Sequence, residues 1–357
     1  MDKSILKYNR EIYVAPFDEG DVMYFETALP IEGEEISLLY PISEVLFVTN
    51  YGLNIIYEEG KDYLVKNGKI IIPSGSKIKQ LSIDEYYLKG GTSFPLKISK
   101  EHCPYKFNED RFVLYGEGDF FTKNQIAVTY KHLNTHSLYS QVEQRDKLPN
   151  FFNKISKNHE ASILFYGDSI TVGCNSSGTE YGNNTSPYAE SWPVMVSKTI
   201  EDRCKTKINY INTAVGGTTT EWGRDNYKER VNKYHPDLLV LAFGMNDPWN
   251  KYKHISLIKE IINGVREDNP DCDVILISTS VPNQESEQVK LESKYFYEEY
   301  ERLDIDRVAV VNMTKVHLDI LKYKKFKDMT GNNVNHPNDF LARLYAQSIL
   351  KVLGLYH

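Results

Sequence analysis

Residues 163–170 read Ile-Leu-Phe-Tyr-Gly-Asp-Ser-Ile, an apolar run of strand character that stops at Gly167 and places Ser169 two residues later. In open α/β sheets, ligands bind outside the carboxyl ends of the parallel strands, so this pattern predicts a serine hydroxyl at that edge. A serine there can act as a nucleophile if a base and an oxyanion site face it. Taken alone, Ser169 is equally typical of a helix N-cap.

The chain after about residue 160 alternates between apolar strand-like runs and helix-like segments. Nearly continuous apolar strands indicate a parallel sheet that is buried on both faces. Because crossovers between parallel strands are right-handed, the carboxyl ends of these strands should share one edge. We expect strands at 162–166, 208–212, 238–242, 274–278 and 308–312, and helices at 191–203, 220–234, 255–268, 286–302 and 339–352.

The first 150 residues show a different pattern, with short strand-like runs separated by turn signals and no long helical periodicity. Asn67-Gly68 between two apolar triplets is a strong hairpin signal. We expect an all-β, jelly-roll-like sandwich over 1–150 as an accessory domain, a linker at 144–150, and an α/β domain over 151–357. The expected strands are 22–27, 35–39, 45–49, 53–57, 69–72, 111–115 and 125–130.

Composition argues against several classes of function. The formal net charge of −7, with 41% hydrophobic and 25% charged residues, is typical of a globular protein without the basic patch that marks nucleic-acid or membrane-surface binding. No run is long enough to span a bilayer and the N-terminus lacks a signal-peptide core, so we expect a cytoplasmic location. The four cysteines form no Cys-x-x-Cys pair, which favours free thiols over a metal or redox site: Cys103, Cys174, Cys204 and Cys272.

Four loops expected at one sheet edge carry residue types that suit acyl transfer; they span 167–171, 212–218, 244–248 and 331–337. His336 would take the proton of the Ser169 hydroxyl, because a free serine is a poor nucleophile. The tetrahedral oxyanion would need preorganised donors. The backbone N–H groups of Ser169 and Gly217 and the Asn246 amide could supply them, since glycine admits close approach and asparagine offers N–H.

Each loop also has a plainer structural interpretation. The pair 216–217 is typical of a tight turn, and 246–248 of a turn or cap. The dipeptide 336–337 is typical of a helix start capped by Asn338 or Asp339. Four such loops, in one order at one edge of one sheet, favour a shared site over four unrelated turns.

The four blocks together resemble those of the SGNH hydrolases, the GDSL-like esterase superfamily. Gly-Asp-Ser-Ile at 167–170, Asn-Thr-Ala-Val-Gly-Gly at 212–217 and Gly-Met-Asn-Asp at 244–247 are similar to the first three family blocks, and His336 stands at the position of the family histidine. The resemblance covers about residues 160–357. It implies a three-layer, flavodoxin-like α/β/α fold, ester hydrolysis through an acyl-serine, and no metal or other cofactor. The Gly-x-Ser-x-Gly elbow of α/β-hydrolases is absent.

One position departs from the family pattern. The family usually has an aspartate three residues before the histidine, where this chain has Asn333. The equivalent Asp-to-Asn change in a serine protease costs about 10⁴-fold in rate, chiefly because the imidazole takes the wrong tautomer. We therefore expect a Ser169–His336 dyad with Asn333 as a weak or indirect orienter. Asp339 is a second candidate, although it suits the N-terminus of the following helix better.

A β-sandwich before an SGNH domain without the triad acid resembles the family 2 carbohydrate esterases, which remove acetyl groups from sugars. That resemblance implies a small-molecule or oligosaccharide ester as substrate and leaves open whether the protein is a homo-oligomer. Trp249, and also Trp192 and Trp222, are candidates for stacking on a sugar ring, although each is more often simply packed. The alternatives are a lysophospholipase or thioesterase, an O-acetyltransferase, and a carbohydrate-binding protein without activity.

Overall fold

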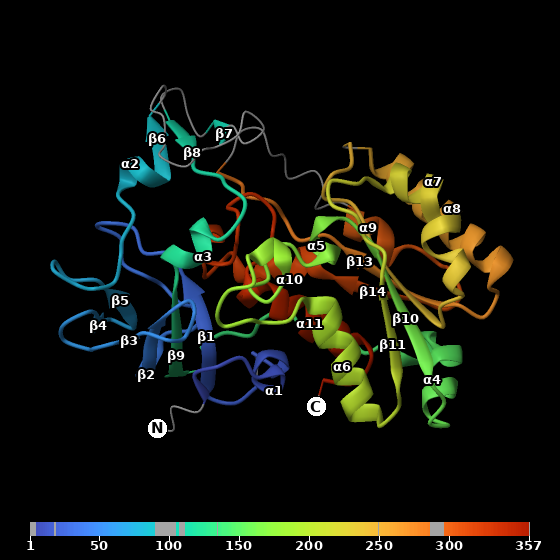
Figure 1. Cartoon of the computed structure of the whole chain (residues 1–357), viewed down its shortest axis with the longest axis horizontal. Helices are drawn as coiled ribbons and strands as arrows, with labels where there is room; N and C mark the ends of the chain where they lie inside the picture. Colours follow the sequence, from blue (N-terminus) through green and yellow to red (C-terminus); the bar gives the residue numbers. More distant parts are fainter. Residues whose placement is uncertain are drawn as a thin grey trace.

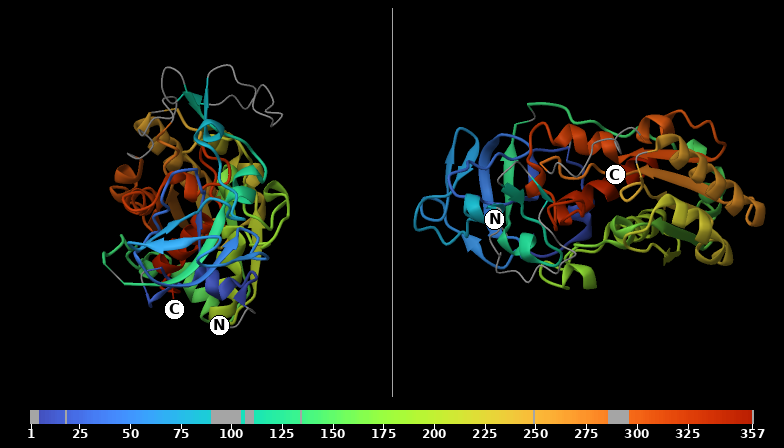
Figure 2. Two further views of the ribbon diagram at one scale, coloured as in Figure 1. Left: turned by 90° about the vertical axis from the view of Figure 1, so that its left-hand side faces the viewer. Right: turned by 90° about the horizontal axis from the view of Figure 1, so that it is seen from above.

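The computed structural model describes residues 5–17, 19–89, 105–106, 111–133, 135–248, 250–285 and 296–356. An antiparallel sheet lies at one end of the molecule and a parallel sheet with its helices at the other (Figures 1 and 2). The last helix, α11 (Asp339–Val352), lies between them and contacts strands of both sheets.

The parallel sheet has the strand order that a flavodoxin-like fold requires. Its five strands pair in parallel in the order β11-β10-β12-β13-β14. The chain order therefore reverses between β10 and β12, which is where open α/β sheets hold ligands. The strands are β10 (Ala161–Gly167), β11 (Ile208–Asn212), β12 (Leu238–Ala242), β13 (Asp273–Ser278) and β14 (Val308–Asn312). The parallel sheet predicted from the sequence is thus confirmed.

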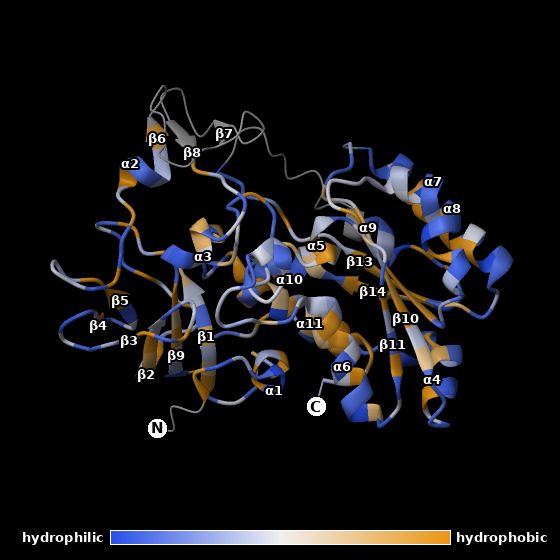
Figure 3. Ribbon diagram, viewed as in Figure 1, coloured by the Kyte–Doolittle hydropathy of each residue, from blue (hydrophilic) through white to orange (hydrophobic). Residues whose placement is uncertain are grey.

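Helices cover both faces of this sheet, because successive residues of each strand point to opposite sides. Ile163 and Phe165 belong to one apolar cluster, Leu164 and Tyr166 to the other. The first face is covered by α4 (Pro149–Ile155), α6 (Trp192–Cys204), α10 (Met313–Ile320) and α11, the second by α7 (Thr220–Arg230), α8 (Lys251–Asp268) and α9 (Phe296–Glu301). Strands β10, β13 and β14 are mainly hydrophobic, the edge strand β11 is mixed, and α7 is largely hydrophilic (Figure 3). Part of the helix expected over 286–302 lies outside the described residues.

The N-terminal part is built mainly from antiparallel strands. Its largest sheet has the order β1-β9-β2-β3, and the hairpin β4-β5 turns at Asn67-Gly68 as predicted. The strands are β1 (Val22–Ala28), β2 (Ile42–Asn50), β3 (Ile56–Tyr57), β4 (Leu64–Lys66), β5 (Lys69–Ile71), β6 (Tyr87–Lys89), β7 (Tyr105–Lys106), β8 (Arg111–Val113) and β9 (Ile126–His132).

Two expectations for this part are wrong in detail. Short helices interrupt the strands, namely α1 (Arg10–Val14), α2 (Ile83–Tyr86) and α3 (Phe120–Asn124). The segment 35–39 is not a strand, because it pairs only through an isolated bridge between Ile36 and Ile70. Its leucines fill the core without joining a ladder. The jelly-roll topology stays a prediction.

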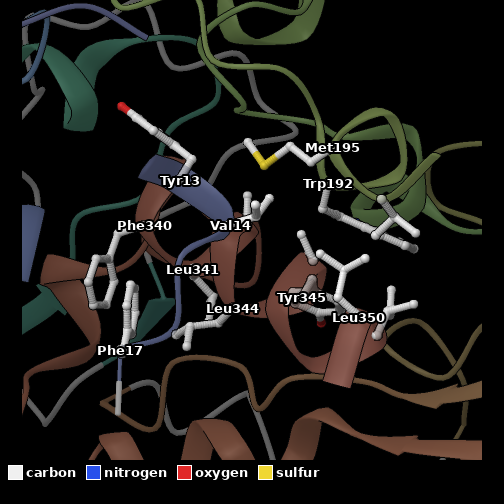
Figure 4. Packing of buried hydrophobic residues seen from close by; sticks show 14 of the residues in the cluster. Tyr13, Val14, Phe17, Trp192, Met195, Phe340, Leu341, Leu344, Tyr345 and Leu350 are labelled. Atoms are coloured by element: carbon white, nitrogen blue, oxygen red, sulfur yellow. The ribbon is translucent and has the colours of Figure 1, made fainter. Parts of the chain in front are cut away.

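One continuous hydrophobic cluster joins the two parts of the chain. Phe17, from the segment after α1, stacks on Phe340 of α11, with ring centroids 4.9 Å apart (Figure 4). Beside them the buried Arg343 guanidinium donates to the backbone carbonyls of Tyr13 and Tyr24. The antiparallel sheet therefore packs against the same core as the helices of the parallel sheet.

A fully buried ion pair at this junction gives a stability prediction. Lys324 Nζ lies 2.9 Å from Glu26 Oε1, and neither side chain is exposed. Removing one partner leaves a buried charge uncompensated, so Lys324→Met should lower the free energy of unfolding by about 3–5 kcal/mol in denaturant titrations. Lys131→Met, which breaks the exposed pair with Glu44, is the matched control and should cost about 1 kcal/mol or less. Equal losses in the two variants would contradict the prediction.

Candidate active site

Ser169 is the first residue of a short helix at the carboxyl end of β10. The strand must end in a glycine, because a Cβ at Gly167 would lie 2.2 Å from the carbonyl oxygen of Ala242 in β12. The N-cap of helix α5 (Ser169–Val172) is Asp168, whose Oδ1 accepts from the Ile170 N–H at 3.0 Å. The interpretation of Ser169 as a cap is therefore wrong, and its hydroxyl is free for another partner.

That partner is His336, whose Nε2 lies 2.9 Å from Ser169 Oγ. The histidine is carried by the loop before α11, which folds around the Asn332 side chain. Asn332 Oδ1 accepts from the backbone N–H groups of Val334, Asn335 and His336 at 2.9, 3.0 and 3.0 Å. The ring is largely buried, at 8% exposed, and is held in place by this loop geometry.

The second ring nitrogen of His336 has two acceptors. Asn175 Oδ1 lies 2.8 Å from Nδ1, and Glu117 Oε2 lies 3.2 Å from it. Asn175 Nδ2 donates to the Gly118 carbonyl at 2.8 Å, which assigns the amide oxygen to the ring side. A proton on Nδ1 satisfies both acceptors and leaves Nε2 to accept from Ser169. This is the tautomer that a general base needs.

Glu117 belongs to the N-terminal part of the chain, 219 residues from His336. Its Oε1 accepts from the Tyr115 hydroxyl at 2.9 Å and from Asn332 Nδ2 at 3.0 Å. Burial by itself would raise the pKa of Glu117, but the His336 imidazole and these two donors hold the pKa down at about 2. The sequence does not predict a role for Glu117 or Asn175, because neither lies in a family block or at a spacing that ties it to His336.

Asn333 does not take the place of the family aspartate. Its Nδ2 donates to the Leu114 carbonyl at 2.8 Å, and its Oδ1 accepts from Asn283 Nδ2 at 3.2 Å and from the Tyr86 hydroxyl at 3.3 Å. Asn333 is expected to be a weak or indirect orienter, and the structure leaves it only the indirect role, since Asn175 and Glu117 occupy the position beside His336 Nδ1. Asn333 has a positive φ of 64°, and its side chain contacts Leu114 and Tyr86 of the N-terminal part.

Asp339, the second candidate for orienting His336, makes its hydrogen bonds with other residues. Its Oδ1 accepts from the Ser177 N–H at 2.9 Å, and the Tyr51 hydroxyl accepts from the Asp339 N–H at the same distance. Burial raises the pKa of this carboxyl to about 6. Asp339 therefore fastens the start of α11 to the loop after α5, while Asn338 is the N-cap of that helix.

The loops that carry Gly217 and Asn246 meet beside Ser169. A Cβ at Gly216 would lie 3.7 Å from the Cβ of Ser169, so this loop borders the serine. Gly217 has a φ of +75°, and nothing lies within 4 Å of the position where a Cβ would stand. Asn246 Nδ2 donates to the Thr218 carbonyl at 3.1 Å, and this bond ties the third loop to the second.

A buried network anchors the Asn246 loop from behind. Both Asp247 carboxylate oxygens accept from the Thr220 N–H, at 3.2 and 3.1 Å, and Oδ1 lies 3.3 Å from His254 Nδ1. The other ring nitrogen of His254 contacts the Tyr300 hydroxyl. The Asn246-Asp247 pair is thus more than a turn, because its aspartate joins the starts of α7 and α8.

The tryptophans offer little support for a stacking face. Trp192 is 1% exposed and donates from Nε1 to the Ile170 carbonyl at 2.8 Å, so it supports the serine loop from the core. Trp222 packs against Tyr166. Trp249 lies outside the described residues.

Neither a metal centre nor a membrane span is seen in the part of the chain that the structure describes. Within it, no group of three or more His, Cys, Asp or Glu side chains could hold a metal ion, and none of its helices has the length and apolar character needed to cross a bilayer. Cys174, Cys204 and Cys272 are free, and Cys103 falls outside the described residues.

Comparison with solved structures places the fold among known esterases. A two-domain esterase active on acetylated mannans, crystallised with mannopentaose, is 19% identical, with a TM-score of 0.50 over 60% of this chain and 55% of its own. An acetyl xylan esterase, AlAXEase, is 19% identical, with a TM-score of 0.43 over 53% of this chain and 97% of its own. The acetylxylan esterase Axe2 from Geobacillus stearothermophilus is 16% identical, with a TM-score of 0.42 over 54% of this chain and 94% of its own. This chain therefore spans about half the length of the mannan esterase, and that likeness shows the fold.

Sequence comparison gives the family. No curated protein matches the chain, but residues 165–342 match the GDSL-like Lipase/Acylhydrolase family. The match runs from within β10 to the first turn of α11 and so includes the loops of Ser169, Gly217, Asn246 and His336. This C-terminal part of the chain belongs to the GDSL-like lipase/acylhydrolase family, in agreement with its resemblance to the SGNH hydrolases.

Proposed function

We propose that the protein is a serine esterase that removes short acyl groups, above all O-acetyl groups of carbohydrates, through an acyl-serine intermediate. The observation that carries the proposal is the 2.9 Å contact between Ser169 Oγ and His336 Nε2, with acceptors on the other ring nitrogen. Membership of an acylhydrolase family supports the same reaction type. The N-terminal residues 1–150, with their antiparallel sheet, serve as a jelly-roll-like accessory domain.

In the proposed mechanism, His336 Nε2 takes the hydroxyl proton while Ser169 Oγ attacks the ester carbonyl carbon. The resulting oxyanion accepts from the backbone N–H groups of Ser169 and Gly217 and from Asn246 Nδ2, each donor being worth roughly 3–4 kcal/mol. Collapse breaks the bond to the alkoxy oxygen, which takes the proton from His336 and leaves as the alcohol. Water, activated by the same imidazole, then releases the acid and restores Ser169.

The proposed substrate class comes from the likeness of the fold to that of a carbohydrate esterase. The mannan esterase of similar fold acts on acetylated mannans, so acetylated oligosaccharides are the first substrates to test. We expect kcat/KM to fall roughly tenfold or more from p-nitrophenyl acetate to the octanoate, and acetate to be released from acetylated manno- or xylo-oligosaccharides. Rates that rise with chain length would instead favour a lysophospholipase or thioesterase. Acetyl transfer to added oligosaccharide that outpaces acetate release would favour an acetyltransferase.

A further inference from the structure

The contacts of His336 join residues from both parts of the chain, and they assign a role to a carboxylate outside the family blocks. We propose that Glu117, carried by the N-terminal part, is the acidic positioning residue of a Ser169–His336–Glu117 triad. The protein then works with a complete triad assembled across its two parts, and not with a dyad. This inference rests on the proposed function and concerns the same site.

The two roles of the usual triad aspartate, orienting the imidazole and supplying negative charge, fall to two different residues, Asn175 and Glu117. Asn175 Oδ1, at 2.8 Å, accepts a hydrogen bond from the Nδ1–H group and so fixes the tautomer. Glu117 Oε2, at 3.2 Å from the same nitrogen, adds the negative charge. That charge stabilises the imidazolium that forms when Nε2 takes the proton of Ser169. An amide acceptor alone would orient the ring without stabilising its charged form.

The segment that carries Glu117 is clamped to the loop that carries His336. The Gly116 N–H donates to the Asn332 carbonyl at 3.3 Å, and Asn332 Nδ2 donates to Glu117 Oε1 at 3.0 Å. Asn333 Nδ2 donates to the Leu114 carbonyl at 2.8 Å. Asn333 therefore acts on His336 indirectly, by holding the segment whose carboxylate reaches the ring.

Other titratable groups lie near the His336 imidazole, but they either make no contact with it or are uncharged at neutral pH. Burial raises the pKa of Asp168 to about 7, against the opposing effect of the Ile170 N–H and His336, and raises the pKa of Cys174 to about 12. The Tyr115 hydroxyl donates to Glu117. Among the residues that the structure describes, Glu117 is the carboxylate that both contacts the imidazole and stays ionised through the neutral range.

A purely structural role for Glu117 predicts different behaviour. Its side chain is 37% exposed, and ion pairs at such exposure contribute little to stability. If Glu117 served only as a surface ion pair, its removal would change neither the rate nor the pH dependence of the reaction. Kinetics and titration, and not stability alone, therefore test the proposal.

The test compares Glu117→Gln with the wild-type full chain on p-nitrophenyl acetate. We expect kcat/KM at neutral pH to fall by about 10- to 100-fold, less than the roughly 10⁴-fold loss in a serine protease, because Asn175 still holds the correct tautomer. The acid limb of the pH profile should move to lower pH, since the neutral amide no longer stabilises the protonated ring. Glu117→Asp, which keeps the charge, should restore part of the rate. Asp119→Asn, on the same loop but paired with Lys123, should change neither quantity.

A second measurement needs no substrate. In protein with ¹³C-labelled histidine, the His336 signal, assigned by its loss in His336→Gln, should titrate at lower pH in Glu117→Gln than in wild type. An unchanged titration together with unchanged kcat/KM would overturn the proposal. A shifted titration in a protein that hydrolyses no ester would overturn the proposed function while supporting the coupling of Glu117 to His336.

Discussion

Replacing Ser169 with alanine should lower kcat/KM for p-nitrophenyl acetate by at least about 10⁴-fold. The substitution removes the atom that attacks the carbonyl carbon, while the oxyanion donors and the substrate-binding surface remain. The rate left over should therefore be only the modest acceleration that those groups give to attack by water. Stopped assays with high enzyme concentration can measure it, and mass spectrometry of the acid-quenched enzyme should find an acetyl adduct in wild type but not in the variant.

The matched control is Ser197→Ala. Ser197 is also buried, but its hydroxyl donates to the Pro193 carbonyl within α6, and alanine suits a helix interior at least as well. This variant should keep wild-type activity and a similar melting temperature. A Ser169→Ala protein that folds and still hydrolyses acetyl esters at near wild-type rates would rule out the acyl-serine mechanism.

The sequence predicted those parts of the fold and site whose cause is local. Strands 238–242 and 308–312 have the predicted bounds, because an apolar run between helices marks a buried parallel strand. The edge strand 208–212 also has the predicted bounds, although Ile208 is its one buried residue. Ser169, Gly217 and Asn246 lie in the loops that follow β10, β11 and β12, so their place at the sheet edge could be inferred from the chain. The His336 position could be inferred because its loop leads into the last amphipathic helix.

The elements that the sequence does not predict depend on weak local signals or on tertiary packing. The sequence predicts a linker at 144–150, but α4 begins at Pro149, and proline at the first helical position favours a helix. The helix α10 follows β14 without a break, so no turn residues in the sequence mark where the helix begins. Ile36 and Leu39 are residue types that favour strands, yet they are buried in the core as part of a loop. Burial alone does not require a partner strand.

The acid of the site could not be predicted, for a physical reason. The family aspartate is local to the histidine, three residues away, whereas Glu117 reaches His336 only because the antiparallel sheet packs against α11. Contacts at a separation of 219 residues leave no periodicity in a single sequence. The sequence does show, at Asn333, that the local aspartate is absent, which indicates that another group must hold the ring.

Replacing Asn246 with alanine should lower kcat by about 10²- to 10³-fold and leave KM nearly unchanged. An oxyanion donor is used fully only when the carbonyl oxygen gains its negative charge, so its loss raises the barrier more than it weakens substrate binding. Asn246 is held for this role by its bond to the Thr218 carbonyl and by the Asp247–His254 contact behind it. Full Michaelis–Menten curves on an aryl acetate separate the two parameters.

Asn226→Ala is the matched control, since Asn226 donates only within α7, to the Trp222 carbonyl, and its loss should leave both parameters unchanged. Asn246→Asp should be at least as damaging as Asn246→Ala, because a carboxylate offers no N–H and places negative charge beside the developing oxyanion. A rise in KM at constant kcat in Asn246→Ala would instead make Asn246 a substrate-binding residue. The oxyanion would then depend on the backbone donors of Ser169 and Gly217 alone.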